Sequence, residues 1–175
     1  MRIRVAVKTL VLALFVGGTT GCGYNRIQQL DEAAAKAKQN ISVQLQRRAD
    51  LVPNLVETVK GYAKQEAEIF EAVAQARGAL AGAVSSGNLG QMSSASTQLN
   101  GALGRLLAIS ESYPQLKSNE NFIRLQDELA GTENRIGVAR TDYNTTVNEY
   151  NTYIRTFPAV LTAKVMGSAA REYFE

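Results

Sequence analysis

The chain has 175 residues but contains no histidine and only one cysteine. Without histidine it cannot form zinc sites that use imidazole, bundle di-iron sites built on Glu-x-x-His, or a serine–histidine or cysteine–histidine catalytic pair. One cysteine excludes a disulfide within the chain. The length predicts a single domain that is large enough to bury a hydrophobic core without such crosslinks.

The chain also has no excess of positive charge after its N-terminal segment. The formal net charge is +3, but Arg2, Arg4 and Lys8 all precede Cys22. Without these three residues, the 19 basic residues fall to 16, which equals the number of acidic residues. The sequence therefore predicts no nucleic-acid binding, although its calculated isoelectric point is 9.1.

Residues 1–21 follow the three-part pattern of a secretory signal. Residues 1–8 carry positive charge and no acid, residues 9–16 are almost wholly apolar, and residues 17–21 are small or polar. The apolar run is about half of the ~20 residues that comfortably span a bilayer. We predict that residues 1–21 form a signal peptide or an uncleaved signal anchor, followed by one helical domain over residues 22–175.

The only cysteine stands at the end of this segment. Thr20-Gly21-Cys22 resembles the last three positions of a bacterial lipoprotein signal, whereas Thr19 replaces the usual aliphatic residue. Cys22 is therefore the predicted lipidation site, with an uncleaved anchor or simple secretion as alternatives. Because positive charge stays in the cytoplasm, both membrane alternatives place the domain outside the cytoplasm, anchored in the bacterial cell envelope.

The sequence after Cys22 has the spacing of helices and no alternating stretch long enough for a strand. Apolar residues recur there at intervals of three or four. The clearest such stripe consists of Phe122, Leu125, Leu129, Thr132, Ile136, Ala139, Tyr143, Val147, Tyr150, Ile154 and Phe157.

Capping and helix-breaking residues divide this sequence into four helices. Asp50 can cap a helix that begins at Leu51, with Pro53 in its first turn. A continuous helix kinked near Pro53 is the alternative. Residues 85–88 predict a turn with a capping asparagine. The third helix ends before Pro114, Ser118 or Asn119 can cap the fourth, and Phe157-Pro158 ends it.

Long amphipathic helices joined by short loops pack as antiparallel neighbours. The sequence therefore predicts an all-α fold, an antiparallel up-and-down four-helix bundle of long helices with an N-terminal membrane-targeting segment. The tail from Pro158 is expected to be a short helix or extended segment, interrupted by Gly167. Residues 79–104, rich in glycine, alanine and serine, should form the most mobile helical part.

The densest group of polar residues lies between Gln44 and Tyr62. It contains two arginines, the run Asp-Leu-Val-Pro-Asn-Leu-Val over residues 50–56, and Glu-Thr-Val-Lys-Gly-Tyr over residues 57–62. This segment resembles the hallmark of the LemA family, and the likeness extends over nearly all of the chain after Tyr24. The resemblance implies a four-helix up-and-down bundle with an N-terminal membrane segment. It implies no enzymatic activity.

Several polar residues of this segment surround Pro53. We expect Asp50, Pro53 and Asn54 to stabilise a kink, with the Asn54 side chain reaching backbone carbonyls that the proline leaves free. The alternative function is a docking surface, for which the candidate residues are Arg47, Arg48 and Glu57. A catalytic role is the least favoured.

Other polar residues suggest no chemistry. Asn144 and Asn151 resemble a polar seam that fixes the register of packed helices. Asp127, Glu128 and Glu133 are scattered around a helix and are expected on a solvated face. The glycines match no nucleotide-binding fingerprint. We therefore predict no catalytic, cofactor-binding or metal-binding residues.

The leading functional hypothesis is a membrane-tethered helical interaction or scaffold protein that binds a protein partner or another copy of itself and is not an enzyme. No small-molecule substrate is identified. One alternative is a hydrolase or other enzyme that uses carboxylates, and it would need convergent carboxylates with shifted pKa values. Another is a lipid-binding bundle, which would need an uncovered apolar face.

Overall fold

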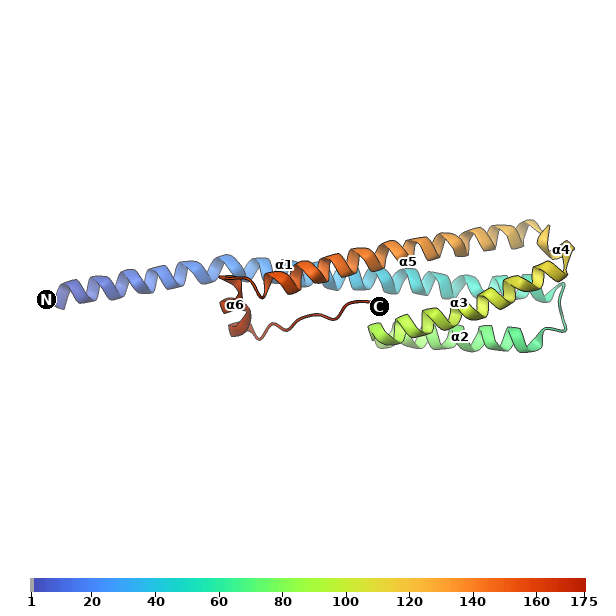
Figure 1. Ribbon diagram of the computed structural model, residues 1–175, viewed down its shortest axis with the longest axis horizontal. Coiled ribbons are helices and arrows are strands. Elements are labelled where there is room, and N and C mark those ends of the chain that lie inside the picture. The colour runs from blue at the N-terminus through green and yellow to red at the C-terminus, as the bar shows by residue number, and fades with distance from the viewer. Residues whose placement is uncertain (1) are drawn as a thin grey trace. The chain divides into compact units, whose positions relative to one another are not determined.

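The computed structural model describes the backbone of residues 2–175 and the side chains of residues 23–175. All regular secondary structure in this part is helical, which confirms the predicted all-α class (Figure 1). The helices are α1 (Arg2–Lys60), α2 (Ala67–Ser86), α3 (Leu89–Ser112), α4 (Pro114–Lys117), α5 (Glu120–Tyr153) and α6 (Ala159–Met166).

The predicted signal segment and lipidation site, residues 1–21 and Cys22, lie outside the residues whose side chains are described. Among the described residues, no helix combines the length and the apolar character needed to cross a membrane.

The described chain divides into two compact units. Unit 1 comprises the described residues up to Ala37 together with Asp142–Tyr173, and unit 2 comprises Lys38–Thr141 with Phe174–Glu175. Both α1 and α5 contribute residues to each unit. Each unit is described below by itself.

The first interhelical turn differs from the predicted one. Helix α1 continues through Pro53 and ends at Lys60, so the expected helix start at Leu51 is wrong and the alternative of a continuous helix is correct. Pro53 lies on the exposed side of α1, where its ring takes up no space in the core. The chain turns instead over residues 61–66, where the N–H groups of Tyr62 and Ala63 both donate to the Val59 carbonyl oxygen.

The predicted turn at residues 85–88 is confirmed. Gly87 ends α2 in the left-handed conformation with φ of 66°, which glycine adopts without steric cost. Asn88 then caps α3, because its Oδ1 accepts a hydrogen bond of 2.9 Å from the Gln91 backbone N–H. This short turn leaves α2 and α3 side by side in unit 2 (Figure 1).

The boundaries of α5 match the predicted boundaries at the N-terminal end only. Asn119 is its cap, because its Oδ1 accepts a hydrogen bond of 3.0 Å from the Phe122 backbone N–H. At the other end, α5 stops at Tyr153, four residues before the predicted Phe157. Phe157 lies in the following turn and is 76% exposed, so the buried stripe ends at Ile154.

The rest of the predicted stripe forms the core side of α5, with every member from Phe122 to Ile154 buried. In unit 2, four helices contact one another through their side chains. Ser42 of α1 contacts Met92 of α3, Arg48 of α1 pairs with Glu133 of α5, Arg77 of α2 binds Ala49 of α1, and Arg140 of α5 binds Ser96 of α3.

The tail contains both predicted elements, a short helix and an extended segment. Helix α6 ends at Gly167, whose φ of 68° is again left-handed. Residues 168–175 follow without regular secondary structure. In unit 1, Ala163 of α6 joins a buried cluster with Ile27, Leu30, Tyr150 and Ile154.

Candidate functional site

The segment from Arg47 to Tyr62 is divided between two sides of α1. One side packs into unit 2, and its buried residues are Arg48, Ala49, Val52, Leu55 and Val59. The other side is exposed and carries Arg47, Asp50, Asn54 and Glu57 at intervals of three or four residues. Helical periodicity alone separates the two sets.

Arg48 belongs to the interior, which corrects its expected place on an exposed partner surface. The residue is 7% exposed and its guanidinium pairs with the Glu133 carboxylate of α5. An arginine at this inward position is compatible with the core because its charge has a partner there. Glu133 is therefore part of an interhelical ion pair, whereas Asp127 and Glu128 are exposed as predicted.

A second arginine, the half-buried Arg140 of α5, lies near Arg48 in unit 2. Burial lowers the pKa of the Arg48 guanidinium, and the nearby positive charge of Arg140 lowers it further. Burial also lowers the pKa of Arg140. Arg140 binds the Ser96 hydroxyl at 3.5 Å and lies 4.7 Å from the centre of the Phe174 ring. These contacts hold its planar guanidinium between α3 and the last residues of the chain.

Pro53 leaves one backbone carbonyl of α1 without its usual helical donor. A residue in a helix donates its N–H to the carbonyl four positions earlier, and proline has no N–H, so the free carbonyl here is that of Ala49. Arg77 of α2 replaces this donor, because its Nε donates a hydrogen bond of 2.9 Å to the Ala49 oxygen. The lost backbone bond of α1 has thus become a bond between α1 and α2.

This role was expected of Asn54, but at the Ala49 carbonyl the donor is Arg77. Asn54 is exposed, and its carbonyl oxygen accepts a hydrogen bond of 2.8 Å from the Thr58 hydroxyl. Asp50 is also exposed, and its carboxylate accepts 2.9 Å from the Gln46 amide. The sequence contained the signal for a free carbonyl at residue 49. It did not show which arginine would meet it, since Arg77 lies 28 residues further along the chain.

Two hollows lie between α1 and α2, and together we call them the α1–α2 groove. The first has a volume of about 420 Å³, and its lining includes Arg47 and Asp50 beside Val43 and Val84. The second, of about 210 Å³, has Glu57 at its edge. Its lining residues are Val52, Pro53, Val56, Glu57, Lys60, Phe70, Val73, Ala74 and Arg77.

In the second hollow of the groove, the lining is mainly apolar and the rim is charged. The Lys60 ammonium lies 5.6 Å from the centre of the Phe70 ring and 3.5 Å from the Glu57 carboxylate. The groove therefore combines an apolar floor with charges of both signs at its edge.

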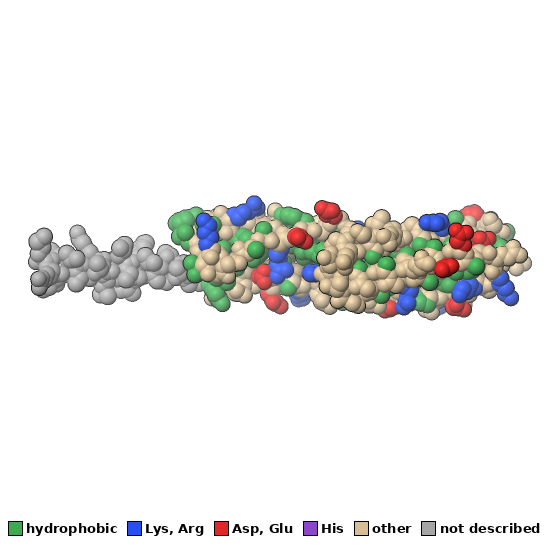
Figure 2. Space-filling model, turned by 90° about the horizontal axis from the view of Figure 1, so that it is seen from below, with side chains coloured by type: hydrophobic (Ala, Val, Ile, Leu, Met, Phe, Trp, Pro, Cys, Tyr) green, Lys and Arg blue, Asp and Glu red, His purple; other side chains and the backbone are tan. Residues whose placement is uncertain are grey.

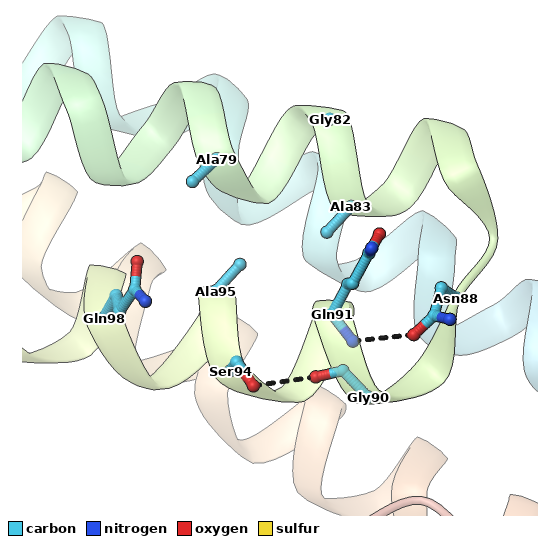
Figure 3. Close-up of a pocket in the computed structure, with 9 residues that line it drawn as sticks. All are labelled: Ala79, Gly82, Ala83, Asn88, Gly90, Gln91, Ser94, Ala95 and Gln98. Atoms are coloured by element: carbon cyan, nitrogen blue, oxygen red, sulfur yellow. Dashed lines mark hydrogen bonds between the residues drawn. The ribbon is translucent and has the colours of Figure 1, made fainter.

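Another hollow, of about 550 Å³, lies between α2 and α3, beside their connecting turn (Figure 3). It exists because small side chains line both helices there. Its polar groups already serve the local backbone, since Asn88 caps α3 and the Ser94 hydroxyl donates to the Gly90 carbonyl. No ionisable side chain lines it, and its residues are Ala79, Gly82, Ala83, Asn88, Gly90, Gln91, Ser94, Ala95 and Gln98.

In unit 1, Asn151 binds the extended tail and has a more specific role than the expected polar seam. Its amide donates 2.9 Å to the Arg171 carbonyl oxygen and accepts 2.8 Å from the Arg171 N–H. The Arg171 side chain pairs with Asp31 of α1 at 2.8 Å. Tyr143 donates a hydrogen bond of 2.8 Å to the Glu172 carbonyl oxygen. Within the described residues, no group of acidic or cysteine side chains is arranged to hold a metal ion.

These contacts define a class of all-helical protein whose buried polar residues chiefly join its own helices and tail. The chain belongs to the LemA family, whose model matches residues 37–175 and confirms the resemblance seen in the sequence.

The chain is also similar to three magnetosome proteins. It is 29% identical over 178 residues to each of magnetosome proteins MamQ 1 and MamQ 2 of Paramagnetospirillum magneticum, covering 87% of this chain and 64% of each relative. It is 29% identical over 197 residues to magnetosome protein MamQ of Magnetospirillum gryphiswaldense, covering 99% of this chain and 72% of that relative. The chain thus spans less than two thirds of the length of the first two relatives.

Proposed function

We propose that this protein is a membrane-tethered, extracytoplasmic interaction or scaffold protein of the LemA type, and that it is not an enzyme. Family membership and the similarity to magnetosome proteins support a LemA-type, membrane-associated protein. We further propose that its long helices form an antiparallel four-helix bundle. Contacts among α1, α2, α3 and α5 within unit 2 support that arrangement.

The observation that carries the proposal is the α1–α2 groove. The inward side of the segment from Arg47 to Tyr62 already has partners within the chain. Arg48 pairs with Glu133, and Arg77 binds the Ala49 carbonyl. Arg47 and Glu57 remain exposed, one at each hollow. They stay candidates for a partner surface, without Arg48.

The size of the second hollow favours a protein partner. Its volume of about 210 Å³ is below the roughly 300–1,000 Å³ typical of small-molecule sites. A single large apolar side chain can fill such a space, and interface hot spots are commonly side chains of this kind seated in pockets. Charges at the rim then select and orient the partner.

In-cell photo-crosslinking tests this proposal directly. A crosslinking residue replaces Arg47 or Glu57 in the full chain, and a matched chain carries it at Arg124, which is exposed on α5. We expect a specific protein crosslink, to a partner or a second copy, from positions 47 and 57 and none from 124. Equal products at all three positions, or none at 47 and 57, would contradict the groove as an interface.

Charge reversal provides the quantitative arm of the experiment. Arg47→Glu and Glu57→Lys should weaken capture at least about tenfold, which corresponds to about 1.4 kcal/mol. Their unfolding midpoints should stay close to that of the unmodified chain, because exposed substitutions usually change stability by about 0.5 kcal/mol or less. Arg124→Glu should change neither capture nor stability.

The membrane tether has its own test. If Cys22 is lipidated, the unmodified chain incorporates labelled fatty acid, and Cys22→Ser accumulates as an unlabelled precursor. An unmodified chain that stays in the membrane fraction, keeps Met1 and takes up no label would show an uncleaved anchor instead. A chain released from the membrane by washing would contradict both forms of tether.

A further inference from the structure

Helix α6 has its small residues inside and its large apolar residues outside. Ala159 and Ala163 are each 3% exposed, whereas Leu161 is 56% and Val165 is 90% exposed. Phe157, four residues before Leu161, is 76% exposed. A surface helix in water normally has the opposite arrangement, with its large apolar residues toward the core. The exposed set of Phe157, Leu161 and Val165 is called the α6 face below.

The small residues bring α6 close to the first described turn of α1. A Cβ added at Gly23 would lie 3.6 Å from the Ala159 Cα and 3.4 Å from the Thr162 hydroxyl oxygen. These are van der Waals distances, so α6 lies directly beside the backbone of α1 at Gly23. The Ala163 side chain joins the buried cluster of unit 1, so α6 is fixed beside Gly23 while the α6 face points away from the core.

Gly23 directly follows the predicted membrane attachment. If Cys22 carries lipid, Gly23 is the next residue. If the apolar run 9–16 is an anchor, Gly23 follows its end by seven residues, a rise of about 10 Å in a helix. That rise compares with the roughly 5–8 Å thickness of one headgroup layer. Both alternatives in the sequence therefore bring α6 to the bilayer surface.

The charges around the α6 face match a lipid surface. Residues 155–167 contain Arg155 and Lys164 but no acidic residue. Both basic side chains are exposed, as is Tyr24 beside Gly23, at 49%. Figure 2 shows hydrophobic and basic side chains close together at the end of unit 1 that carries α6. Aromatic and basic residues around an apolar face are typical of membrane–water interfaces.

We propose that the α6 face inserts into the interfacial layer of the bilayer, with Arg155 and Lys164 at the lipid headgroups. This inference rests on the membrane tether of the proposed function. It adds a second contact, which orients unit 1 on the membrane rather than leaving it on a free tether. A lone apolar helix of eight residues would bind weakly, but the tether makes its contact with lipid intramolecular.

Site-specific fluorescence tests the proposal, because the chain contains no tryptophan. Val165→Trp is introduced into the full chain and reconstituted in phosphatidylcholine–phosphatidylglycerol vesicles. The matched control is Val138→Trp, since Val138 is 61% exposed on α5. Emission is measured with bromine-labelled acyl chains and with acrylamide in the water. Circular dichroism and unfolding midpoints confirm that both variants fold.

We expect tryptophan at position 165 to emit at shorter wavelength in vesicles and to be quenched several-fold more by brominated lipid than tryptophan at position 138. Adding Leu161→Asp to Val165→Trp should remove most of this difference. Equal quenching by acrylamide at positions 165 and 138 would overturn the proposal. Shorter-wavelength emission without bromine quenching would also overturn it, because a protein would then cover the face.

The same preparation separates failure of this inference from failure of the tether. A Val165→Trp chain that floats with the vesicles but keeps its indole in water retains its tether and lacks the second contact. A chain that does not float with the vesicles contradicts the tether and the inference together.

Discussion

Arg77 donates a hydrogen bond from its Nε to the carbonyl oxygen of Ala49, the carbonyl that Pro53 leaves without a backbone donor in α1. The proline and the arginine belong to different helices, but the proline frees the carbonyl to which the arginine donates. Pro53 creates a free acceptor at a fixed height on α1, and Arg77 fixes the height of α2 against it. The bond therefore sets the register of the two helices that form the α1–α2 groove.

Removing Arg77 should destabilise the protein in a way that depends on Pro53. Arg77→Ala leaves the buried Ala49 carbonyl unpaired, which typically costs about 1–3 kcal/mol. In a Pro53→Ala background, alanine at position 53 supplies the missing N–H, so the same Arg77→Ala change should cost clearly less. Denaturant unfolding of the four chains gives the coupling energy.

The outcome that contradicts this relationship is additivity. If Arg77→Ala costs the same with and without Pro53, the arginine stabilises the fold by packing alone. Arg105→Ala, a change to an arginine of α3, provides a comparison for the loss of an arginine at another position.

The ion pair between the buried Arg48 and the half-exposed Glu133 gives a second prediction. Glu133→Gln leaves the Arg48 charge buried beside Arg140 and should destabilise the protein by roughly 1–3 kcal/mol. Arg48→Met removes the buried charge and keeps most of the volume, and the half-exposed Glu133 can then be solvated, so the change should be close to neutral or stabilising. Urea unfolding midpoints measure both effects.

Glu128→Gln is the matched control, because Glu128 is exposed on the same helix. Its unfolding midpoint should stay near that of the unmodified chain. A large loss of stability in Arg48→Met would show that the pair contributes more than its replacement by apolar contacts, against the expectation above.

Much of the fold follows from the sequence because helical spacing reports directly on burial. The stripe from Phe122 to Ile154 is inside, and Asn88 and Asn119 cap their helices as expected. The predicted helix start near Pro53 was wrong for a physical reason. Proline in a helix interior removes one backbone hydrogen bond and often breaks the helix, but here Arg77 of α2 supplies the missing donor.

The candidate site could be predicted only in part. The sequence places Arg47, Arg48 and Glu57 in one segment. Assigning each residue to the buried or the exposed side required knowing that α1 is continuous. A continuous α1 places Arg48 inward and Arg47 outward, although they are adjacent. Arg77 and Glu133 complete the network from other helices, and local spacing contains no information about such distant partners.

A third prediction concerns the tail of unit 1. Asn151→Leu removes both hydrogen bonds to the Arg171 backbone, so the tail should detach while α5 stays folded. We expect faster amide exchange at Arg171 and faster trypsin cleavage after it. Hydrogen exchange with mass spectrometry and limited proteolysis measure the two rates.

Asn148→Leu is the control for this experiment, since Asn148 lies on α5 three residues earlier and is exposed. Its side chain only accepts a hydrogen bond of 3.3 Å from the Tyr173 hydroxyl. Equal cleavage rates in the two variants would show that Asn151 is not what holds the tail.

Tyr143 gives a prediction for alkaline pH. Burial raises the pKa of its hydroxyl, the Glu172 charge raises it further, and Arg171 opposes the rise. The folded state therefore holds this proton more tightly than the unfolded state. The resulting stability is complete below the unfolded pKa of about 10 and is lost as the pH rises through the folded value.

The comparison is between the unmodified chain and Tyr143→Phe, whose free energies of unfolding are measured from about pH 8 to about pH 11. We expect a constant difference below about pH 10 and a steeper loss in the unmodified chain above it. A difference that stays constant throughout this range would rule out a contribution from Tyr143.

The glycines of α2 and α3 have a consequence for how the protein opens. Four of them, at positions 78, 82, 101 and 104, face space in which an added methyl group would meet no atom within 4 Å. Each costs about 0.5–1 kcal/mol of helix stability relative to alanine. The hairpin of α2 and α3 is therefore roughly 2–4 kcal/mol less stable than it would be with alanine at these four positions. The lowest free energy of local unfolding in unit 2 is expected in this hairpin, well before the core side of α5 is exposed to water.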